Sequence, residues 1–406
     1  MNLFFMIKIT YFLLFVLFIN THQLNAKTIN LHLWATPFEP KLFNKITHLF
    51  HQQNPNINVI ATSYPSDDFK AALIQTILKD EAPDMILIPN DLLGYHQVLQ
   101  LAKIPKDWLL DTTSKKLLNE IKINQQQFAI PIFTGNHLLL FYNRQLIDKP
   151  AKTWQEMYQQ HLKLQAKSIN TLGINISKMY YFIGFLNAYN GFPVKGSNIV
   201  INIDTTVKAL KAYKRLITDN LVDIHCDYVC KNQQFFNGEL AYNIDGLWAY
   251  QNNKRRLKEN LAVALLPTLD GLKLKSMSGS HVLAFPNNSS QSEKASVIKK
   301  FAHFLQGDQI QTLLYQQLHM IPANQNTRRN LLTNNDDKVI FEQLSQTITM
   351  PVSTAMEALW DGMDVGVNLF LNDQLNAVQA AQFIKKQTAR QLIRIKRLNN
   401  IEGKIH

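Results

Sequence analysis

The stretch FFNGELAYNIDGLWAY, residues 235–250, carries the pattern that decides the fold. Gly238 follows two phenylalanines and an asparagine, and glycine is the residue that tolerates a positive φ just past a helix end. Residues 240–245 then alternate in a period of two, which predicts a short β-strand. Gly246 ends that strand, and Trp248 follows on a new turn. We therefore expect a large aromatic side chain just beyond the carboxyl end of a strand, where open α/β sheets bind their ligands.

The length and composition describe a globular chain with more than one core. At 406 residues the chain exceeds one ordinary core and is expected to divide into two domains. With 46% hydrophobic and 18% charged residues, it does not have a disordered composition. The formal net charge is +12, but no long Lys/Arg block appears before the C-terminal end, and the basic residues are not interleaved with aromatic ones. This pattern argues against a nucleic-acid groove, and no nucleic-acid partner is predicted.

Residues 1–26 have the pattern of a secretory signal peptide. Lys8 precedes an apolar run over residues 9–19, which is too short to span a bilayer, and polar residues lead to Ala26. No cysteine lies near the junction, so a lipid anchor is not expected. The sequence predicts a soluble periplasmic protein that begins near Lys27.

The chain after the signal alternates between strand and helix patterns. The expected order is a strand at 29–33, a helix at 42–50, a strand at 57–61, a helix at 69–77 and a buried strand at 85–88. Ser66 is the expected N-cap of the second helix. These elements form a parallel βαβαβ unit, and Trp34 and Asp91 fall at the carboxyl ends of its strands.

Three motifs together resemble one known family. The first is Phe236 and Gly238 before a strand that leads into GLWA at 246–249; the others are YNR at 142–144 and KTW at 152–154. They resemble family 1 of the bacterial extracellular solute-binding proteins, the maltose-binding type, which serve ABC transporters. The similarity runs in order from about residue 34 to about residue 391.

The resemblance implies an α/β, two-lobed periplasmic binding protein fold of type II-like form. Each lobe would be a mainly parallel sheet flanked by helices, with the ligand cleft between the lobes. The expected lobes are residues 27–133 with 268–322, and residues 134–267 with 323–400. Crossings are expected at 134–136, at 266–268 and at 320–323, and Gly135 can absorb a hinge rotation at the first of them.

The family's sugar contacts, carried over residue by residue, fall on Trp34, Thr36, Glu39, Asp91, Tyr180, Trp248 and Trp360. An aromatic ring packs on the C–H face of a pyranose, and short polar side chains bind its hydroxyls. Alternatives remain at three positions: Tyr181 could replace Tyr180, Asp91 could cap a helix, and Trp360 could pack in the core.

Several positions depart from the maltose-binding pattern. Leu92 replaces an arginine, Ile88 a tryptophan, and Gly135 or Asn136 a glutamate. Two charges are reversed as well, because Glu39 and Lys178 stand where a lysine and a glutamate are expected. We therefore predict a saccharide or polyol in general, with malto-oligosaccharide the nearest guess, and Lys178 leaves room for an acidic or phosphorylated sugar.

The two cysteines allow two interpretations. In an oxidising compartment Cys226 and Cys230 are expected to form a disulfide, although a spacing of four opposes bridging within a regular helix. His225 beside them suggests a metal site, but no fourth ligand is evident. The C-terminal end is basic, and we interpret it primarily as the solvated face of a last helix and secondarily as a contact with an anionic membrane. Its basic residues are Lys385, Lys386, Arg390, Arg394, Lys396 and Arg397.

The sequence thus predicts a monomeric, non-enzymatic, cofactor-free binding protein that captures a sugar by hinge closure and delivers it to membrane permease subunits. The main alternative is a periplasmic glycan hydrolase, which needs two carboxylates facing each other across the cleft. Glu39 and Asp91 are the only obvious pair, and both lie in the first lobe. A third alternative is the same fold binding a polyamine or a metal.

Overall fold

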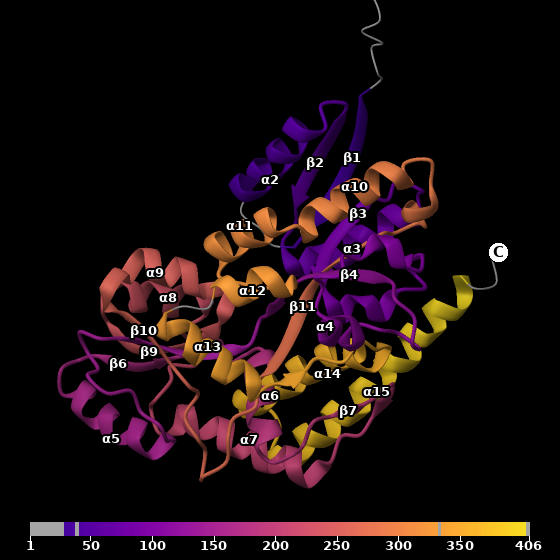
Figure 1. The fold of residues 1–406 in the computed structure, drawn as a ribbon. Coiled ribbons are helices and arrows are strands. Elements are labelled where there is room, and N and C mark those ends of the chain that lie inside the picture. The colour runs from indigo at the N-terminus through magenta and orange to yellow at the C-terminus, as the bar shows by residue number, and fades with distance from the viewer. Residues whose placement is uncertain (1–27, 37–39, 332–333, 403–406) are drawn as a thin grey trace, which may run out of the picture.

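A computed structural model describes residues 28–36, 40–331 and 334–402. The expected signal peptide and Glu39 lie outside the described residues. Within them, two main β-sheets lie at different places along the molecule, and helices cover both (Figure 1).

The larger sheet contains seven strands, in the order β12-β4-β11-β3-β1-β2 with β13 paired to β11. Its strands are β1 (Ile29–Ala35), β2 (Ile57–Ser63), β3 (Met85–Pro89), β4 (Ala129–Gly135), β11 (Met277–Ala284), β12 (Ile321–Pro322) and β13 (Ile348–Thr349). β1 pairs in parallel with both β2 and β3, and helices α2 (Pro40–Gln53) and α3 (Ser66–Ile77) form the crossovers. The expected βαβαβ unit is confirmed.

The smaller sheet has the order β10-β5-β9-β6. Its strands are β5 (Leu138–Asn143), β6 (Asn170–Gly173), β9 (Leu240–Gly246) and β10 (Leu261–Ala264), and a separate hairpin joins β7 (Val194–Lys195) to β8 (Asn198–Ile199). Helix α8 (Tyr228–Asn237) ends at Gly238, which has φ 76° as the sequence predicted. Every residue of β9 is buried, because the strand lies inside the sheet and both of its faces are covered.

Two local expectations are wrong. Both sheets are mixed rather than mainly parallel, because β11 runs antiparallel to β3 and β4, and β5 runs antiparallel to β9 and β10. Ser66 is not an N-cap: α3 begins at Ser66, and Pro65 occupies the capping position without a side-chain hydrogen bond.

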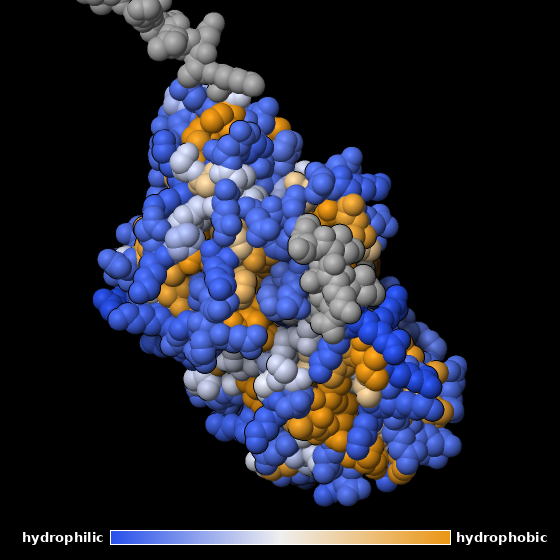
Figure 2. All heavy atoms as spheres, turned by 90° about the vertical axis from the view of Figure 1, so that its right-hand side faces the viewer, coloured by the Kyte–Doolittle hydropathy of each residue, from blue (hydrophilic) through white to orange (hydrophobic). Residues whose placement is uncertain are grey.

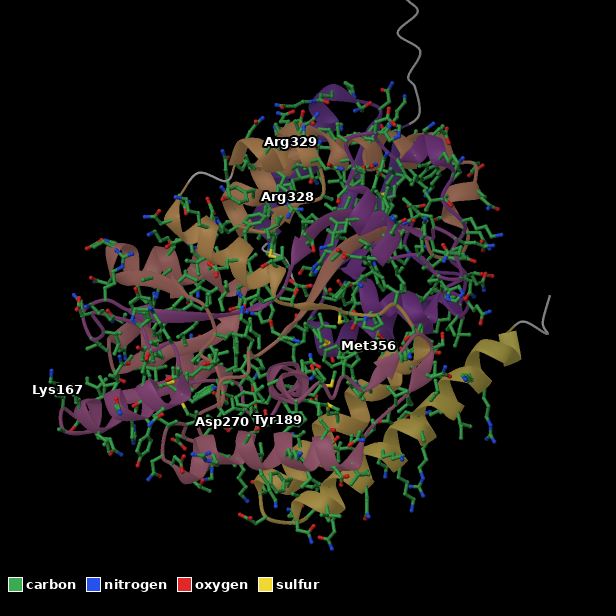
Figure 3. All side chains as sticks on the ribbon, turned by 60° about the horizontal axis from the view of Figure 1, so that its bottom comes forward. Lys167, Tyr189, Asp270, Arg328, Arg329 and Met356 are labelled. Atoms are coloured by element: carbon green, nitrogen blue, oxygen red, sulfur yellow. A yellow bond between two sulfur atoms is a disulfide. The ribbon has the colours of Figure 1, made fainter. Side chains whose placement is uncertain are left out.

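The remaining helices are α4 (Lys115–Glu120), α5 (Trp154–Gln165), α6 (Met179–Ala188), α7 (Ile203–Thr218), α9 (Tyr250–Leu257), α10 (Ala295–Gln306), α11 (Asp308–Leu318), α12 (Gln325–Leu331), α13 (Asn335–Ser345), α14 (Thr354–Leu371) and α15 (Ala377–Glu402). Strand β13 lies between α13 and α14. Met356 near the start of α14 is fully buried (Figure 3).

The last two helices pack closely and reach both parts of the molecule. A Cβ on Gly362 would lie 2.7 Å from the Thr388 side chain, and one on Gly366 would lie 2.3 Å from Ile384. Ile384 packs in the same core as the smaller sheet, whereas Ile395 near the other end of α15 packs with Phe69 beneath the larger sheet. The helix pair therefore spans both cores.

The chain passes between the two sheets near the expected places. Gly135 ends β4 in the larger sheet with φ 135°, and β5 of the smaller sheet begins three residues later. The chain leaves β10 after Ala264 and enters β11 at Met277. The sheet memberships support two lobes, while the residue limits given for each lobe stay a prediction.

The face of the molecule seen in Figure 2 is mainly hydrophilic, with separate hydrophobic patches. None of the described helices is both long enough and apolar enough to cross a membrane.

Candidate functional site

Three aromatic side chains from three different elements form one wall, which we call the aromatic wall. Tyr180 lies on α6, Trp360 on α14, and Trp248 on the short 3₁₀ helix η3 (Leu247–Ala249) after β9. The Tyr180 and Trp360 rings are nearly parallel at 10° with centroids 6.0 Å apart, and Trp248 meets Tyr180 edge-on at 5.7 Å. The Tyr180 hydroxyl donates to the Asn136 carbonyl at 2.5 Å, which fixes the ring beside the first crossing.

The end of β9 determines where Trp248 lies. A Cβ on Gly246 would be 2.0 Å from the Trp248 ring, so the indole can lie over this turn only because residue 246 is glycine. Trp248 remains 39% exposed although its neighbours Leu247 and Ala249 are buried. The prediction that an aromatic side chain lies just beyond the end of this strand is confirmed, and the Trp248 ring is accessible from solvent.

Asp91 joins the wall from the larger sheet. It lies in the 3₁₀ helix η1 (Asn90–Tyr95) directly after β3, and its Oδ2 accepts a 3.0 Å hydrogen bond from the Trp360 indole. Burial raises the pKa of this carboxyl group, and the Trp360 hydrogen bond partly opposes that effect. Its Oδ1 is buried and has no hydrogen-bond partner among the described residues. The capping alternative is wrong, because Pro89 holds the N-cap position of η1.

Two cavities share this wall. Their volumes are about 670 Å³ and about 680 Å³, and both are lined by Pro89, Asp91, Tyr180, Trp248 and Trp360. The first also contacts Phe133, Asn136, Gln251, Asn252, Arg255, His281, Gln317, Leu318, Met320 and Met350. The second also contacts Thr36, Lys70, Leu92, Asn175, Lys178, Tyr181, Tyr228, Glu357 and Asp364. Residues that lie in or directly after strands of both sheets, such as Pro89 and Trp248, therefore line both cavities.

The other expected contacts have different surroundings. Thr36 lines the second cavity, and its buried hydroxyl has no hydrogen-bond partner among the described residues. Trp34 lines neither cavity; its ring packs on Tyr64 with centroids 4.5 Å apart. Tyr181 lines only the second cavity, and its hydroxyl donates to Asp245. Tyr180, which lines both cavities, is thus better placed than Tyr181.

Several lining residues were not predicted from the sequence. The clearest group lies on α9, where Gln251, Asn252 and Arg255 line the first cavity. They follow Trp248 at three, four and seven residues, the spacing of one helix face, so that spacing could have identified them. No comparable signal marks His281 or Glu357, because chain segments distant in sequence bring them to the cavities.

A buried ion pair supports the turn that carries Trp248. Lys231 on α8 donates to Asp245 at 2.7 Å and to Asn243 at 2.8 Å, and all three side chains are almost fully buried. Burial lowers the pKa of Lys231, and the negative charge of Asp245 opposes that shift. Removing one member would leave the other as an uncompensated buried charge. The network ties α8 to β9 directly before Gly246.

The two cysteines form a disulfide between Cys226 and Cys230, with Cα atoms 5.2 Å apart. Asp227 is the N-cap of α8, so Cys226 lies outside the helix and the spacing of four allows the bond. Because both sulfur atoms are in the disulfide, neither cysteine can bind a metal as a thiolate. Among the described residues, no group of three side chains is arranged to hold a metal ion.

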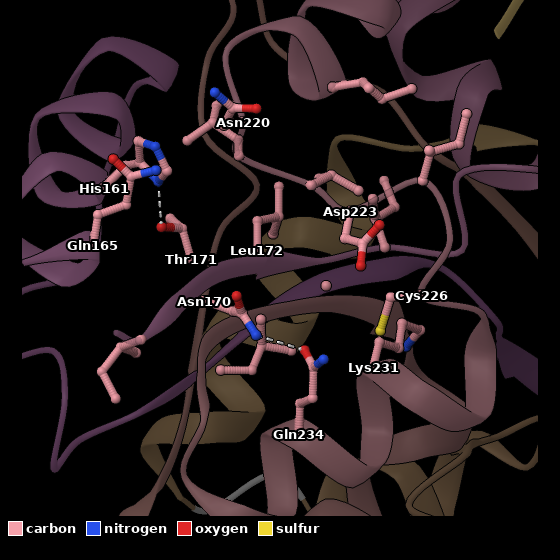
Figure 4. Close-up of a pocket in the computed structure, with 18 residues that line it drawn as sticks. His161, Gln165, Asn170, Thr171, Leu172, Asn220, Asp223, Cys226, Lys231 and Gln234 are labelled. Atoms are coloured by element: carbon pink, nitrogen blue, oxygen red, sulfur yellow. Dashed lines mark hydrogen bonds between the residues drawn. The ribbon is translucent and has the colours of Figure 1, made fainter. Parts of the chain in front are cut away.

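A separate cavity of about 350 Å³ lies between α5, β6 and the start of α8 (Figure 4). Its polar groups largely satisfy one another: His161 bonds to Thr171 at 2.8 Å, and Asn170 donates to Gln234 at 3.1 Å. It has no equivalent of the aromatic wall, so the cavities beside Trp248 are the better candidate site.

The chain is similar in sequence to two characterised binding proteins. A maltooligosaccharide ABC transporter solute-binding lipoprotein from Streptococcus pneumoniae strain R6 is 26% identical over 302 residues, which is 69% of each chain. A maltotriose-binding protein from Pyrococcus abyssi is 22% identical over 84% of this chain and 77% of that protein.

Two solved structures share the fold. The maltose/maltodextrin-binding domain MalE from Bdellovibrio bacteriovorus, bound to maltotriose, gives a TM-score of 0.82 at 19% identity, covering 89% of this chain and 99% of that one. The GacH receptor of Streptomyces glaucescens gives 0.82 at 17% identity, covering 90% and 98%. The family model described as bacterial extracellular solute-binding protein matches residues 35–312. The chain therefore belongs to the bacterial extracellular solute-binding protein family.

Proposed function

We propose that this protein binds a neutral saccharide at the aromatic wall and delivers it to the permease subunits of an ABC transporter. The observation that carries the proposal is the convergence of Tyr180, Trp248 and Trp360 with Asp91 beside two cavities. Such a wall offers flat apolar faces to pyranose rings and acceptors to their hydroxyls. The relatives from Streptococcus pneumoniae and Pyrococcus abyssi, named for maltooligosaccharide transport and maltotriose binding, support the same ligand class.

Binding from two sides gives a reason for hinge closure. Asp91 follows a strand of the larger sheet, and Trp248 follows a strand of the smaller one. A sugar that contacts both groups binds the closed arrangement more tightly than the open one, and only that difference can shift the population. The closed outer surface is then what the permease recognises. We propose that the protein acts as an exported, periplasmic monomer.

The charges beside the wall favour a neutral ligand over an anionic one. Lys70 and Lys178 line the second cavity, but Asp91, Glu357 and Asp364 line it too. A phosphorylated sugar would meet at least as many acids as bases there, so Lys178 alone does not select it. A polyamine would gain from the acids and from cation–π contacts with the aromatic faces, so the titration below includes spermidine as a competing ligand class.

Calorimetric titration tests the proposal. We expect saturable heat with maltotriose or a longer malto-oligosaccharide, and none with glucose 6-phosphate, spermidine or zinc. The bound sugar is then recovered and analysed by chromatography, where we expect it intact. Binding of only the phosphate, the polyamine or the metal would overturn the saccharide assignment. Cleavage of the sugar that is lost in Asp91→Ala would support a hydrolase instead.

A further inference from the structure

The outer face of α15 is a continuous basic surface, which we call the basic face. It consists of Lys385, Lys386, Arg390, Arg394, Lys396 and Arg397, all of them exposed. None of these six forms an ion pair with another residue of the part of the chain that the structure describes. Six charges equal half of the formal net charge of +12.

The sequence around the basic face contains no compensating charge. No acidic residue occurs between Asp373 and Glu402. The spacing of Lys386, Arg390, Arg394 and Arg397 places them in one row along the helix. Lys385 and Lys396 lie about a quarter turn around the helix from that row. At 1.5 Å per residue, positions 385–397 cover about 18 Å of helix. Side chains of the yellow helix at the right of Figure 3 extend away from the body of the protein.

The opposite face of α15 is already occupied. Ile384 and Thr388 contact α14 so closely that glycine is required at two positions of that helix. The basic face therefore lies on the side of α15 away from this packing, where its side chains are exposed to solvent.

An apolar side chain lies within the basic face. Ile393 is 54% exposed, and it lies between Arg390 and Arg394 on one side and Lys396 on the other. Val378 is 48% exposed nearer the start of the same helix. Cations that flank exposed aliphatic side chains are the arrangement of helices that lie on a membrane surface. Residues 385–397 include no aromatic side chain on which a nucleobase could stack, so a single-stranded nucleic acid is not favoured.

We propose that the basic face docks the protein on an anionic phospholipid surface, with its row of cations against the lipid phosphates and Ile393 at the headgroup boundary. Each Lys or Arg near such a surface adds to the attraction, and the effect decays within a Debye length. Docking would hold a protein that feeds a membrane transporter close to the bilayer. The proposal rests on residues outside the two cavities and does not depend on which ligand they bind.

Vesicle sedimentation tests the proposal with the full mature chain. Phosphatidylcholine vesicles with and without phosphatidylglycerol are compared at low ionic strength. We expect binding only to the vesicles that contain phosphatidylglycerol, and its loss near 1 M salt, where the Debye length is about 3 Å. The variant K386E/R390E/R394E should lower the partition coefficient about tenfold or more. Ile393→Ser should lower it by a smaller factor.

A matched control separates the basic face from total charge. K163E/K167E/K211E makes the same change in net charge at exposed lysines on other helices or just beyond one, and it should keep binding near the wild-type value. Circular dichroism and sugar titration without vesicles should be unchanged in both triple variants. An equal loss in the control, equal binding to both kinds of vesicle, or tighter binding to a single-stranded oligonucleotide would overturn the proposal.

Discussion

Trp248 and Trp360 belong to the same wall but have different energetic roles. Trp248 is 39% exposed and follows a glycine turn, whereas Trp360 is partly buried, packs against the core and donates to Asp91. A stacked aromatic contributes about 1 kcal/mol beyond the area it buries, while truncating a buried aromatic costs about 3 to 5 kcal/mol of stability. The two residues therefore report separately on binding and on folding.

We predict that Trp248→Ala weakens saccharide binding about tenfold or more, since a factor of ten corresponds to about 1.4 kcal/mol. The melting temperature of the unliganded protein should change little, because the indole is already substantially exposed. Titration and thermal unfolding of the same sample measure both effects. Trp108→Ala, in a buried position that is 5% exposed, should show the reverse pattern. An unfolded Trp248→Ala protein would contradict the platform role.

His137 makes stability depend on pH. Burial lowers its pKa from the usual 6.5 to about 4, and its Nε2 donates to the Ile340 carbonyl. The unfolded chain takes up a proton near pH 6.5 and the folded protein only near pH 4, so acid favours the unfolded state. This part of the stability is complete above about pH 6.5 and falls by at most about 1.4 kcal/mol per pH unit below it.

Between about pH 7 and about pH 5, we predict that this site alone removes about 2 kcal/mol from the free energy of unfolding. Urea titrations of the wild type and His137→Gln measure the difference, and the variant should have the flatter pH dependence. His48→Gln, at an exposed position, should follow the wild type. Parallel pH curves for the wild type and His137→Gln would contradict the assignment.

At the scale of single elements, the start of α8 depends on the disulfide. The bond closes a short loop before Lys231, whose ion pair with Asp245 supports the turn that carries Trp248. Constraining so short a loop contributes about 2 kcal/mol to stability in the chain-entropy model. We predict this loss for Cys226→Ser with Cys230→Ser, measured by urea unfolding. Reductant should lower the free energy of unfolding of the wild type to that of the variant and should leave the variant unchanged. A variant as stable as the oxidised wild type would contradict this prediction.

Elements with a clear period could be predicted, and elements without one could not. The first three strands and their helices follow from apolar spacing, and Gly238 follows from the φ it must adopt. The two-residue strands β12 and β13 leave no periodic signal, because tertiary pairing alone creates them. Trp34 lies at the carboxyl end of β1 as predicted, and the strand period explains its surroundings. Leu31 and Leu33 are buried on one face, so the indole at position 34 points to the other face and meets Tyr64.

At the scale of the whole molecule, the family resemblance predicted which distant residues form the candidate site, whereas local sequence patterns did not. Asp91 and Trp360 are 269 residues apart in sequence and share a hydrogen bond. No propensity rule joins such positions, and only an alignment with a known fold or a structure can do so. Glu357 and His281 also reach the cavities from chain segments that no local sequence pattern connects. Local chemistry identified candidate residues, while the arrangement around the wall required the tertiary contacts.

The final prediction concerns motion between the two sheets. The chain passes between them near Gly135, which has φ 135° and, having no Cβ, can adopt backbone angles that other residues resist. Helices α14 and α15 pack against both cores. These connections restrict the lobes to opening and closing about the cleft. A saccharide that touches both Asp91 and Trp248 should stabilise the closed form. We predict that small-angle scattering of the wild type gives a smaller radius of gyration with saturating malto-oligosaccharide than without it.

Trp248→Ala is the control for that measurement. At a sugar concentration that saturates only the wild type, the radius of gyration of the variant should stay at the unliganded value. Closure must come from the differential affinity of the ligand for the two states, so a variant that binds weakly cannot shift the population. A radius that stays constant for the wild type, while calorimetry shows full occupancy, would mean that the cleft is already closed around its ligand-binding residues. The proposed delivery mechanism would then need a signal other than closure.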